Sequence, residues 1–326
     1  MSASRFNFDA APWDLSTFKG RLKYFFWVTD PRLCLADDKT LDEAKNLRNQ
    51  WRSGQEPKDV KLEQIMRAKQ LYESAFHPDT GEKQNLFGRM CFQVPGGMVI
   101  TGVMLSFYKT TTAVVFWQWV NQSFNALVNY TNRNANSPLT NTQMGVAYGS
   151  ATLAACFTAI KFKSFLAKHS GPFMQRYVPF AAVAAANCVN IPLMRQNEIT
   201  EGVDVLDENG NKVGTSRVAA VKGISQVVLS RIIMCAPGML LLPAVMERLC
   251  NKSPWILRNT WFHAPFQTIG VGCFLTMMVP TACAIFPQLS SIQVSTLEKA
   301  EPRCYEQIKT TCKGNLPALV YSNKGL

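Results

Sequence analysis

The sequence has few charged residues, very little histidine and none of the short motifs that mark common enzyme classes. Charged residues make up 17% of the 326 residues, against roughly 25% in soluble domains. No P-loop, GxGxxG, GxSxG or HExxH pattern is present, and histidine occurs only three times. These absences argue against nucleotide-binding, hydrolase and metalloprotease functions, and we predict that the chain is not an enzyme.

Metal and cofactor motifs are missing as well. None of the ten cysteines belongs to a CxxC pair, which argues against zinc-ribbon and dithiol redox motifs. His77, Asp79 and Glu82 lie in one short segment, but they form no established ligand spacing, and a structural turn is the preferred interpretation. The sequence therefore predicts neither a bound metal nor a cofactor.

The charges that are present are distributed unevenly along the chain. Residues 1–97 hold 28 charged residues, whereas residues 98–286 hold 20, nine of them within residues 195–222. A transmembrane helix needs about 20 mostly apolar residues. Five runs approach that length, and these are residues 98–119, 144–160, 177–194, 224–246 and 264–286.

These runs predict an all-α fold, a multi-pass helical membrane protein with about five transmembrane helices. We expect three parts along the chain. A soluble, helical N-terminal head covers residues 1–95, the transmembrane body covers residues 96–287, and a polar C-terminal tail without a strong element covers residues 288–326.

Lysine and arginine are concentrated in residues 161–176 and 248–258, between the expected spans. With five spans, both loops share a side with the head, and the positive-inside rule makes this the cytoplasm-equivalent side. An odd number of spans places the tail on the opposite side. The formal net charge of +12 is then explained by topology and anionic lipid, and we predict no nucleic-acid partner.

Residues 110–132 carry no charge and offer an alternative, separate crossing. At 100° per residue, six amides fall within an arc of about 100°. They are Gln118, Asn121, Gln122, Asn125, Asn129 and Asn132. Hydrogen bonds between helices and a polar wall along a hydrated path explain this stripe equally well. On the second interpretation, Asn121, Asn125 and Asn129 face a hydrated interior.

The expected spans also contain prolines, each of which removes a backbone donor and frees a carbonyl. The prolines in or beside the spans are Pro179, Pro192, Pro237, Pro243, Pro265 and Pro280. Secondary transporters use broken helices as ligands for substrates, whereas a single proline in a membrane helix often produces only a kink. For each single proline, a simple kink is the preferred interpretation, and a broken helix that binds substrate is the alternative.

Arg231 lies seven residues into the fourth expected span, in a run that is otherwise free of charge. A charge at a helix centre costs about 2.5–3.5 kcal/mol on insertion scales, so this side chain should face a cavity or a partner. Lys109 is the alternative intramembrane cation, but a position near a helix end would let it reach the interface.

Four segments resemble the sideroflexin family, and their order covers nearly the whole chain. They are FHPDTGEK at residues 76–83, WQWVNQSFNA at 117–126, NYTNR at 129–133 and PFAAVAAANC at 179–188. Asn190, Pro192 and Arg195 continue the last segment. The closing YSNKGL departs from the usual YFNKGL by one residue.

The resemblance implies a multi-pass protein of the mitochondrial inner membrane, with the positive side toward the matrix. The N-terminus would then face the matrix and the C-terminus the intermembrane space. Similar members transport serine for mitochondrial one-carbon metabolism, and others are linked to iron and haem handling. Two functions follow as expectations, either a carrier of serine or another small neutral amino acid (alanine or cysteine), or a non-transporting factor in iron homeostasis or respiratory-complex assembly.

A carrier for serine must bind a carboxylate, an ammonium and a hydroxyl group. We predict that Arg231 binds the carboxylate, because a guanidinium offers a bidentate grip. Carbonyls freed near Pro237 and Pro192, together with Asn187 or Asn190, would meet the ammonium and the hydroxyl. Lys109 is the alternative cation.

Overall fold

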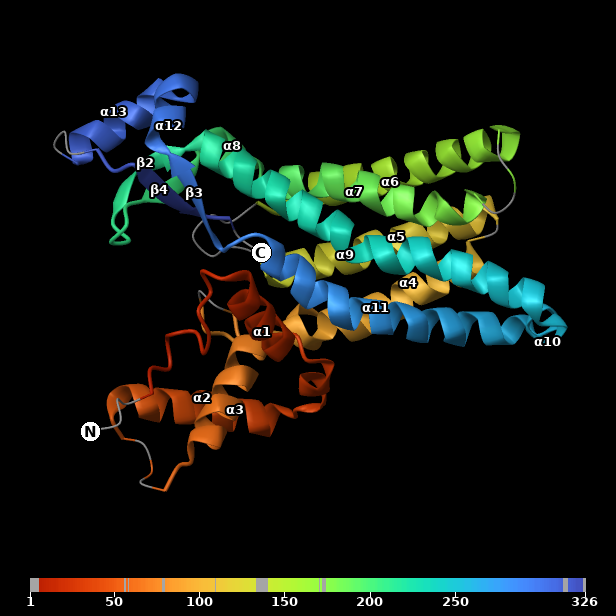
Figure 1. Cartoon of the computed structure of the whole chain (residues 1–326), viewed down its shortest axis with the longest axis horizontal. Helices are drawn as coiled ribbons and strands as arrows, with labels where there is room; N and C mark the ends of the chain where they lie inside the picture. Colours follow the sequence, from red (N-terminus) through yellow and green to blue (C-terminus); the bar gives the residue numbers. More distant parts are fainter. Residues whose placement is uncertain are drawn as a thin grey trace.

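The computed structural model describes residues 6–324 except 56, 58, 78, 79, 109, 133–139, 170, 172, 173 and 313–315, and for residues 129 and 167 it describes the backbone only. Figure 1 shows long helices side by side, with two smaller units at one end of them. We call the long helices the body, the unit built from α1 to α3 the head, and the unit around the sheet the sheet unit. The end of the body that carries both units is the head end, and the opposite end is the far end.

Six long helices in the described chain form the body. They are α4 (Gln93–Phe107), α5 (Thr111–Thr131), α6 (Asn141–His169), α7 (Val178–Met194), α9 (Arg217–Lys252) and α11 (His263–Ile285). Four segments are long and apolar enough to cross a membrane, namely Met90–Phe107, Met174–Met194, Arg217–Lys252 and Thr260–Ile285. Helices α5 and α6 pack beside them. The prediction of an all-α, multi-pass membrane fold is confirmed.

The first expected span, residues 98–119, is wrong in its boundaries. Helix α4 ends at Phe107, and Thr110 begins α5 by accepting a hydrogen bond from the amide of Ala113 at 3.1 Å. Helix α5 then returns to the head, where the Asn132 side chain donates to the Gly88 carbonyl at 3.0 Å. The alternative of a separate helix over residues 110–132 is therefore the correct one, because a threonine N-cap starts a new helix there.

This additional helix places the head and the tail at the same end of the body (Figure 1). Arg21 of the head donates to the carbonyl of Ala284, at the end of α11, at 2.8 Å. Lys324 of the tail donates to the carbonyl of Phe286 at 2.8 Å. Six helices return the chain to the end at which it started. This arrangement conflicts with the expectation that the two termini lie on opposite sides of the membrane.

The basic loops lie at the far end. Arg176 precedes α7 and forms an ion pair with Glu247 near the end of α9. The short helix α10 (Pro254–Arg258) follows α9 at the far end in Figure 1. The expectation that these loops share a side with the head is therefore also wrong.

The tail is not an irregular segment. The strands β1 (Val203–Leu206), β2 (Lys212–Ser216), β3 (Leu289–Gln293) and β4 (Leu319–Asn323) form one antiparallel sheet in the order β2-β1-β4-β3. Helices α12 (Val294–Ala300) and α13 (Pro302–Thr311) cover it, and α8 (Gln196–Glu201) precedes it. Val205, Leu297, Ile308 and Val320 are buried in the core of this sheet unit.

The tail was predicted to lack strong elements because its strands are short and polar. In β3, Ser290 and Ile292 point inward while Leu289 and Ser291 are exposed, which is the alternation of a strand that buries one face. The partner strands β1 and β2 come from the loop before α9, more than 70 residues earlier. Only their pairing makes the tail an ordered unit.

The head is helical, as predicted. It contains α1 (Phe18–Val28), α2 (Asp38–Ser53) and α3 (Leu62–Ala75). Leu41, Ile65 and Leu71 are buried between α2 and α3. Helix α1 packs on the end of α11, so the head is attached directly to the body.

Candidate functional site

An apolar cluster lies between four helices of the body. Met104 of α4, Val183 of α7 and Met239 of α9 are buried together, with Trp117 of α5 packed against them. The cluster therefore joins four helices at one level along the body. We call it the plug and use it as the reference level for the polar residues.

Several candidate side chains lie on the head side of the plug. At about 1.5 Å per helical residue, Asn125 lies about 12 Å from Trp117 along α5, and Arg231 lies about 12 Å from Met239 along α9. Asn190 lies about 10 Å from Val183 along α7 in the same direction. Helix α7 contacts both α5 and α9, so these residues occupy one level on neighbouring helices.

The amide stripe of α5 is mostly buried, but its hydrogen bonds are incomplete. Gln118 donates to the hydroxyl of Tyr108 at 3.1 Å, while its own carbonyl oxygen has no partner in the described chain. The side-chain nitrogen of Asn121 is buried without a partner in the same part of the chain. Asn125 is partly buried, and the side chain of Asn129 lies outside the described residues.

The end of the stripe has a structural role. Asn132 accepts from Gln84 at 2.8 Å and donates to the carbonyl of Gly88 at 3.0 Å, so it ties α5 to the head. Leaving a buried polar atom unsatisfied costs about 1–3 kcal/mol. The open atoms of Gln118 and Asn121 are therefore places where water or a ligand would be stabilised.

Arg231 is partly buried on α9, and no carboxylate of the described chain lies within ion-pair distance of it. It lies close enough to Cys283 of α11 to interact electrostatically with that thiol, as does Lys324. Ser230 and Gln226, on the same helix, each have a buried oxygen without a partner among the described residues. Arg231 thus belongs to a polar stretch of α9 that faces part of α11.

Asn187 and Asn190 lie on α7, which packs on α6 and α9. Asn190 is buried and Asn187 is partly buried. Neither side chain forms a hydrogen bond to a residue that the structure describes. Lys109, the alternative cation, lies outside the described residues.

The prolines do not break the helices. Helix α9 is continuous through Pro237 and Pro243, α7 through Pro192, and α11 through Pro280. The interpretation of these sites as discontinuous helices is therefore wrong, because neighbouring helices hold the backbone in place where a hydrogen bond is lost. Each proline still lacks the amide proton that would bond the carbonyl four residues earlier.

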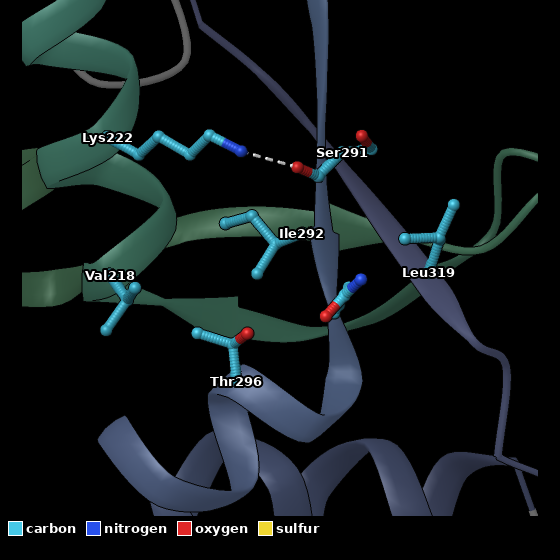
Figure 2. A pocket seen from close by; sticks show the side chains of 7 residues that line it. Val218, Lys222, Ser291, Ile292, Thr296 and Leu319 are labelled. Carbon is cyan, nitrogen blue, oxygen red and sulfur yellow. Dashed lines mark hydrogen bonds between the residues drawn. The ribbon is translucent and has the colours of Figure 1, made fainter.

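A pocket of about 370 Å³ lies outside the body, where α9 meets β3 and α12 (Figure 2). Val218, Ile292 and Leu319 give it an apolar lining. The ammonium of Lys222 donates to the carbonyl of Ser291 at 2.6 Å. The ammonium of Lys222 is already bound to the backbone and is not available to a ligand. The pocket is therefore better explained as a packing gap between the body and the sheet unit than as an amino-acid binding site.

Comparison with known proteins assigns the family. The family model described as Sideroflexins matches residues 7–326. The chain belongs to the sideroflexin family. It is 57% identical to Sideroflexin-2 of Drosophila melanogaster over 318 residues, covering 98% of this chain and 97% of the relative.

Other relatives of this sideroflexin are similar over their full lengths. Sideroflexin-2 of Homo sapiens is 54% identical, with 99% of this chain and 98% of the relative covered. Sideroflexin-1 of Homo sapiens is 50% identical, with 96% and 95% covered. No solved structure matches the chain. The family resemblance derived from the sequence is confirmed.

Arg231 and the amides were predictable from the sequence, whereas the plug and the buried oxygens of Gln226 and Ser230 were not predicted. Methionine and valine are common in apolar runs, so nothing in the sequence indicates that Met104, Val183 and Met239 pack together in the folded protein. Ser230 and Gln226 are four residues apart, next to Arg231, and this spacing on one helix face was the available signal.

Proposed function

We propose that this sideroflexin carries a small neutral amino acid, most directly serine, across the mitochondrial inner membrane to supply one-carbon metabolism. The observation that carries the proposal is Arg231, a cation within a membrane helix that has no acidic partner in the described chain. A charge in that position is costly. A substrate that brings its own carboxylate would offset that cost.

Arg231 binds the substrate carboxylate in this proposal. A guanidinium presents two parallel donors that match a carboxylate. Asn187 and Asn190, on the helix packed against α9, supply acceptors for the ammonium and hydroxyl groups. The carbonyls of Ile233 and Cys188, each four residues before a proline, are further acceptors.

The amides of α5 form the polar wall that leads to this level. Asn121 and Asn125 lie on the head side of the plug, and Asn121 keeps a donor without a partner in the described chain. In this proposal, the plug of Met104, Val183 and Met239 separates this level from the far end.

The orientation of the protein in the membrane follows from the charges at the two ends. The far end carries Lys161, Lys163, Lys168, Arg176, Arg248, Lys252 and Arg258, with Glu247 among them. The positive-inside rule counts such short loops. We therefore propose that the far end faces the matrix, and that the head and the sheet unit face the intermembrane space.

A non-transporting role in iron or haem handling, or in respiratory-complex assembly, is the second candidate. The observation that favours it is the pair of non-membrane units at one end of the body, since such units are suited to bind other proteins. Uptake by purified protein separates the two functions, because a scaffold would not move serine into liposomes.

The test is serine uptake into liposomes by the purified protein and by Arg231→Gln and Arg231→Lys. Hydrogen bonds to a charged group contribute about 1.5–3 kcal/mol. Arg231→Gln should therefore raise the apparent KM about 10- to 150-fold, and Arg231→Lys, which keeps the charge, should raise it less. Arg248→Gln makes the same charge change at an exposed position of the same helix and should leave the KM unchanged.

Wild-type affinity in both Arg231 variants would reject Arg231 as the carboxylate site. Absence of uptake by the wild-type protein would reject transport itself and favour the second candidate. The two failures are therefore distinguishable.

A further inference from the structure

Two cysteines that are far apart in the sequence meet at the base of the head. Cys34 lies in the short helix η1 (Pro31–Leu35), and Cys91 lies in η3 (Met90–Phe92), which packs against η1. Cys91 is fully buried, and Cys34 is partly exposed and packs against the same core. Each thiol is close enough to the other to perturb its pKa, so the two side chains are neighbours.

The surroundings of the pair favour a thiolate on Cys34. The neighbouring Cys91 thiol, together with the Arg89 guanidinium, lowers the pKa of Cys34, against an opposing effect of burial and of Asp30. Arg89 is itself buried and held in place, since it donates to the Gln84 carbonyl at 3.3 Å and lies 3.5 Å from a carboxylate oxygen of Asp38. A partly exposed thiolate beside an arginine is the usual setting of a reactive cysteine.

We propose that Cys34 and Cys91 form a reversible dithiol–disulfide pair, oxidised by a small-molecule disulfide such as glutathione disulfide. The partly exposed Cys34 thiolate attacks one sulfur of that reagent, forms a mixed disulfide and releases one thiolate. Cys91 then gives its proton to the released thiolate and attacks the sulfur of Cys34, which releases the second thiolate. Two protein thiols and one reagent disulfide thus become one protein disulfide and two reagent thiols.

The cross-link would close the head on itself. Helices α2 and α3 lie between the two cysteines in the sequence, so the disulfide joins the beginning and the end of this helical pair. It also fixes η1 to the segment that leads directly into α4, which begins at Gln93. Oxidation is therefore expected to stabilise the head and to fix its attachment to the body, because a disulfide restricts the unfolded chain.

The test treats the purified full-length protein with glutathione disulfide and maps its peptides by mass spectrometry without reduction. The expected product is a peptide cross-linked between Cys34 and Cys91, without a stable glutathione adduct, and reductant should reverse it. In Cys91→Ser, the same treatment should stop at a glutathione adduct on Cys34. In Cys34→Ser, Cys91 should stay unmodified because it is buried.

Cys312→Ser is the matched control, since Cys312 is partly buried in the sheet unit and its loss should not change the cross-link. Alkylation of the native protein gives a second measurement that needs no variant, and it should label Cys34 well before Cys91. A stable glutathione adduct on Cys34 of the wild-type protein, or no reaction at either residue, would overturn the proposal. Equal alkylation rates at the two cysteines would also overturn it.

Discussion

Gly102 of α4 lies at a close approach between two helices of the body. A Cβ atom built on Gly102 would lie 2.4 Å from the Cα atom of Thr268 in α11 and 2.5 Å from its hydroxyl oxygen. The nearest of these atoms is backbone, so it cannot move away by a change of rotamer. Gly102→Ala must therefore push α4 and α11 apart.

The expected cost follows from this contact. Extra volume in a well-packed core costs about 1–3 kcal/mol, while alanine in place of a helical glycine contributes up to about 1 kcal/mol in favour of folding. The packing cost minus the gain in helix propensity leaves a net destabilisation of up to about 3 kcal/mol for Gly102→Ala. The packing between Met98 and Gly272, one turn away along α4, should loosen with it.

Gly149→Ala is the matched control. Gly149 lies in α6, and nothing lies within 4 Å of the position its Cβ atom would take, so the helix propensity of alanine should leave stability unchanged or slightly higher. Thermal unfolding of the two purified variants in the same detergent measures both effects. Equal midpoints for Gly102→Ala and Gly149→Ala would refute the reasoning that the α4–α11 contact limits this position.

Three further predictions concern the head end of the body. An epitope tag at the N-terminus and one at the C-terminus should behave alike, both in intact mitochondria and in mitoplasts treated with protease. If one tag is digested in mitoplasts and the other is protected, the six-helix arrangement is contradicted. The Glu301 carboxylate accepts hydrogen bonds from the Ser216 hydroxyl at 2.6 Å and the Arg217 amide at 3.0 Å. Glu301→Gln should therefore destabilise the start of α9 by about 1 kcal/mol. Amide hydrogen exchange at residues 217–219 should become faster in this variant. Burial lowers the pKa of Lys324 below 10.5, so between the lowered value and 10.5 the unfolded chain binds more protons and stability rises with pH. Lys324→Met should remove this slope in unfolding measurements, and an unchanged slope would assign it to another group.

The candidate site was partly predictable from the sequence. Arg231 stands out because a charge in an apolar run is expensive, and the amides of α5 stand out because they repeat on one helical face. Their common level on the head side of the plug was not predictable, because it depends on which residues of α4, α7 and α9 pack together. The alternative of broken helices was wrong for a related reason, since a proline predicts a missing hydrogen bond and its neighbours decide whether the helix continues.

The number of helices in the body was also only partly predictable from the sequence. Apolar composition alone merged Phe107 and Thr111 into one run, since the few residues between the two helices change the hydropathy little. The Thr110 cap and the contact of α5 with Gly88 separate them. Because each added helix reverses the direction of the chain, this one boundary also changed the predicted positions of the tail and of both basic loops.

A helical membrane protein of the sideroflexin family with a helical head is predictable from local sequence patterns, because long apolar runs and short motifs are properties of neighbouring residues. Three features become visible only in the folded protein: both termini lie at one end, the tail completes a sheet begun before α9, and Cys34 lies beside Cys91 at the base of the head. Each of these depends on contacts between residues far apart in the chain. The free energy of such contacts comes from burial and pairing across elements, which no local pattern in the sequence records.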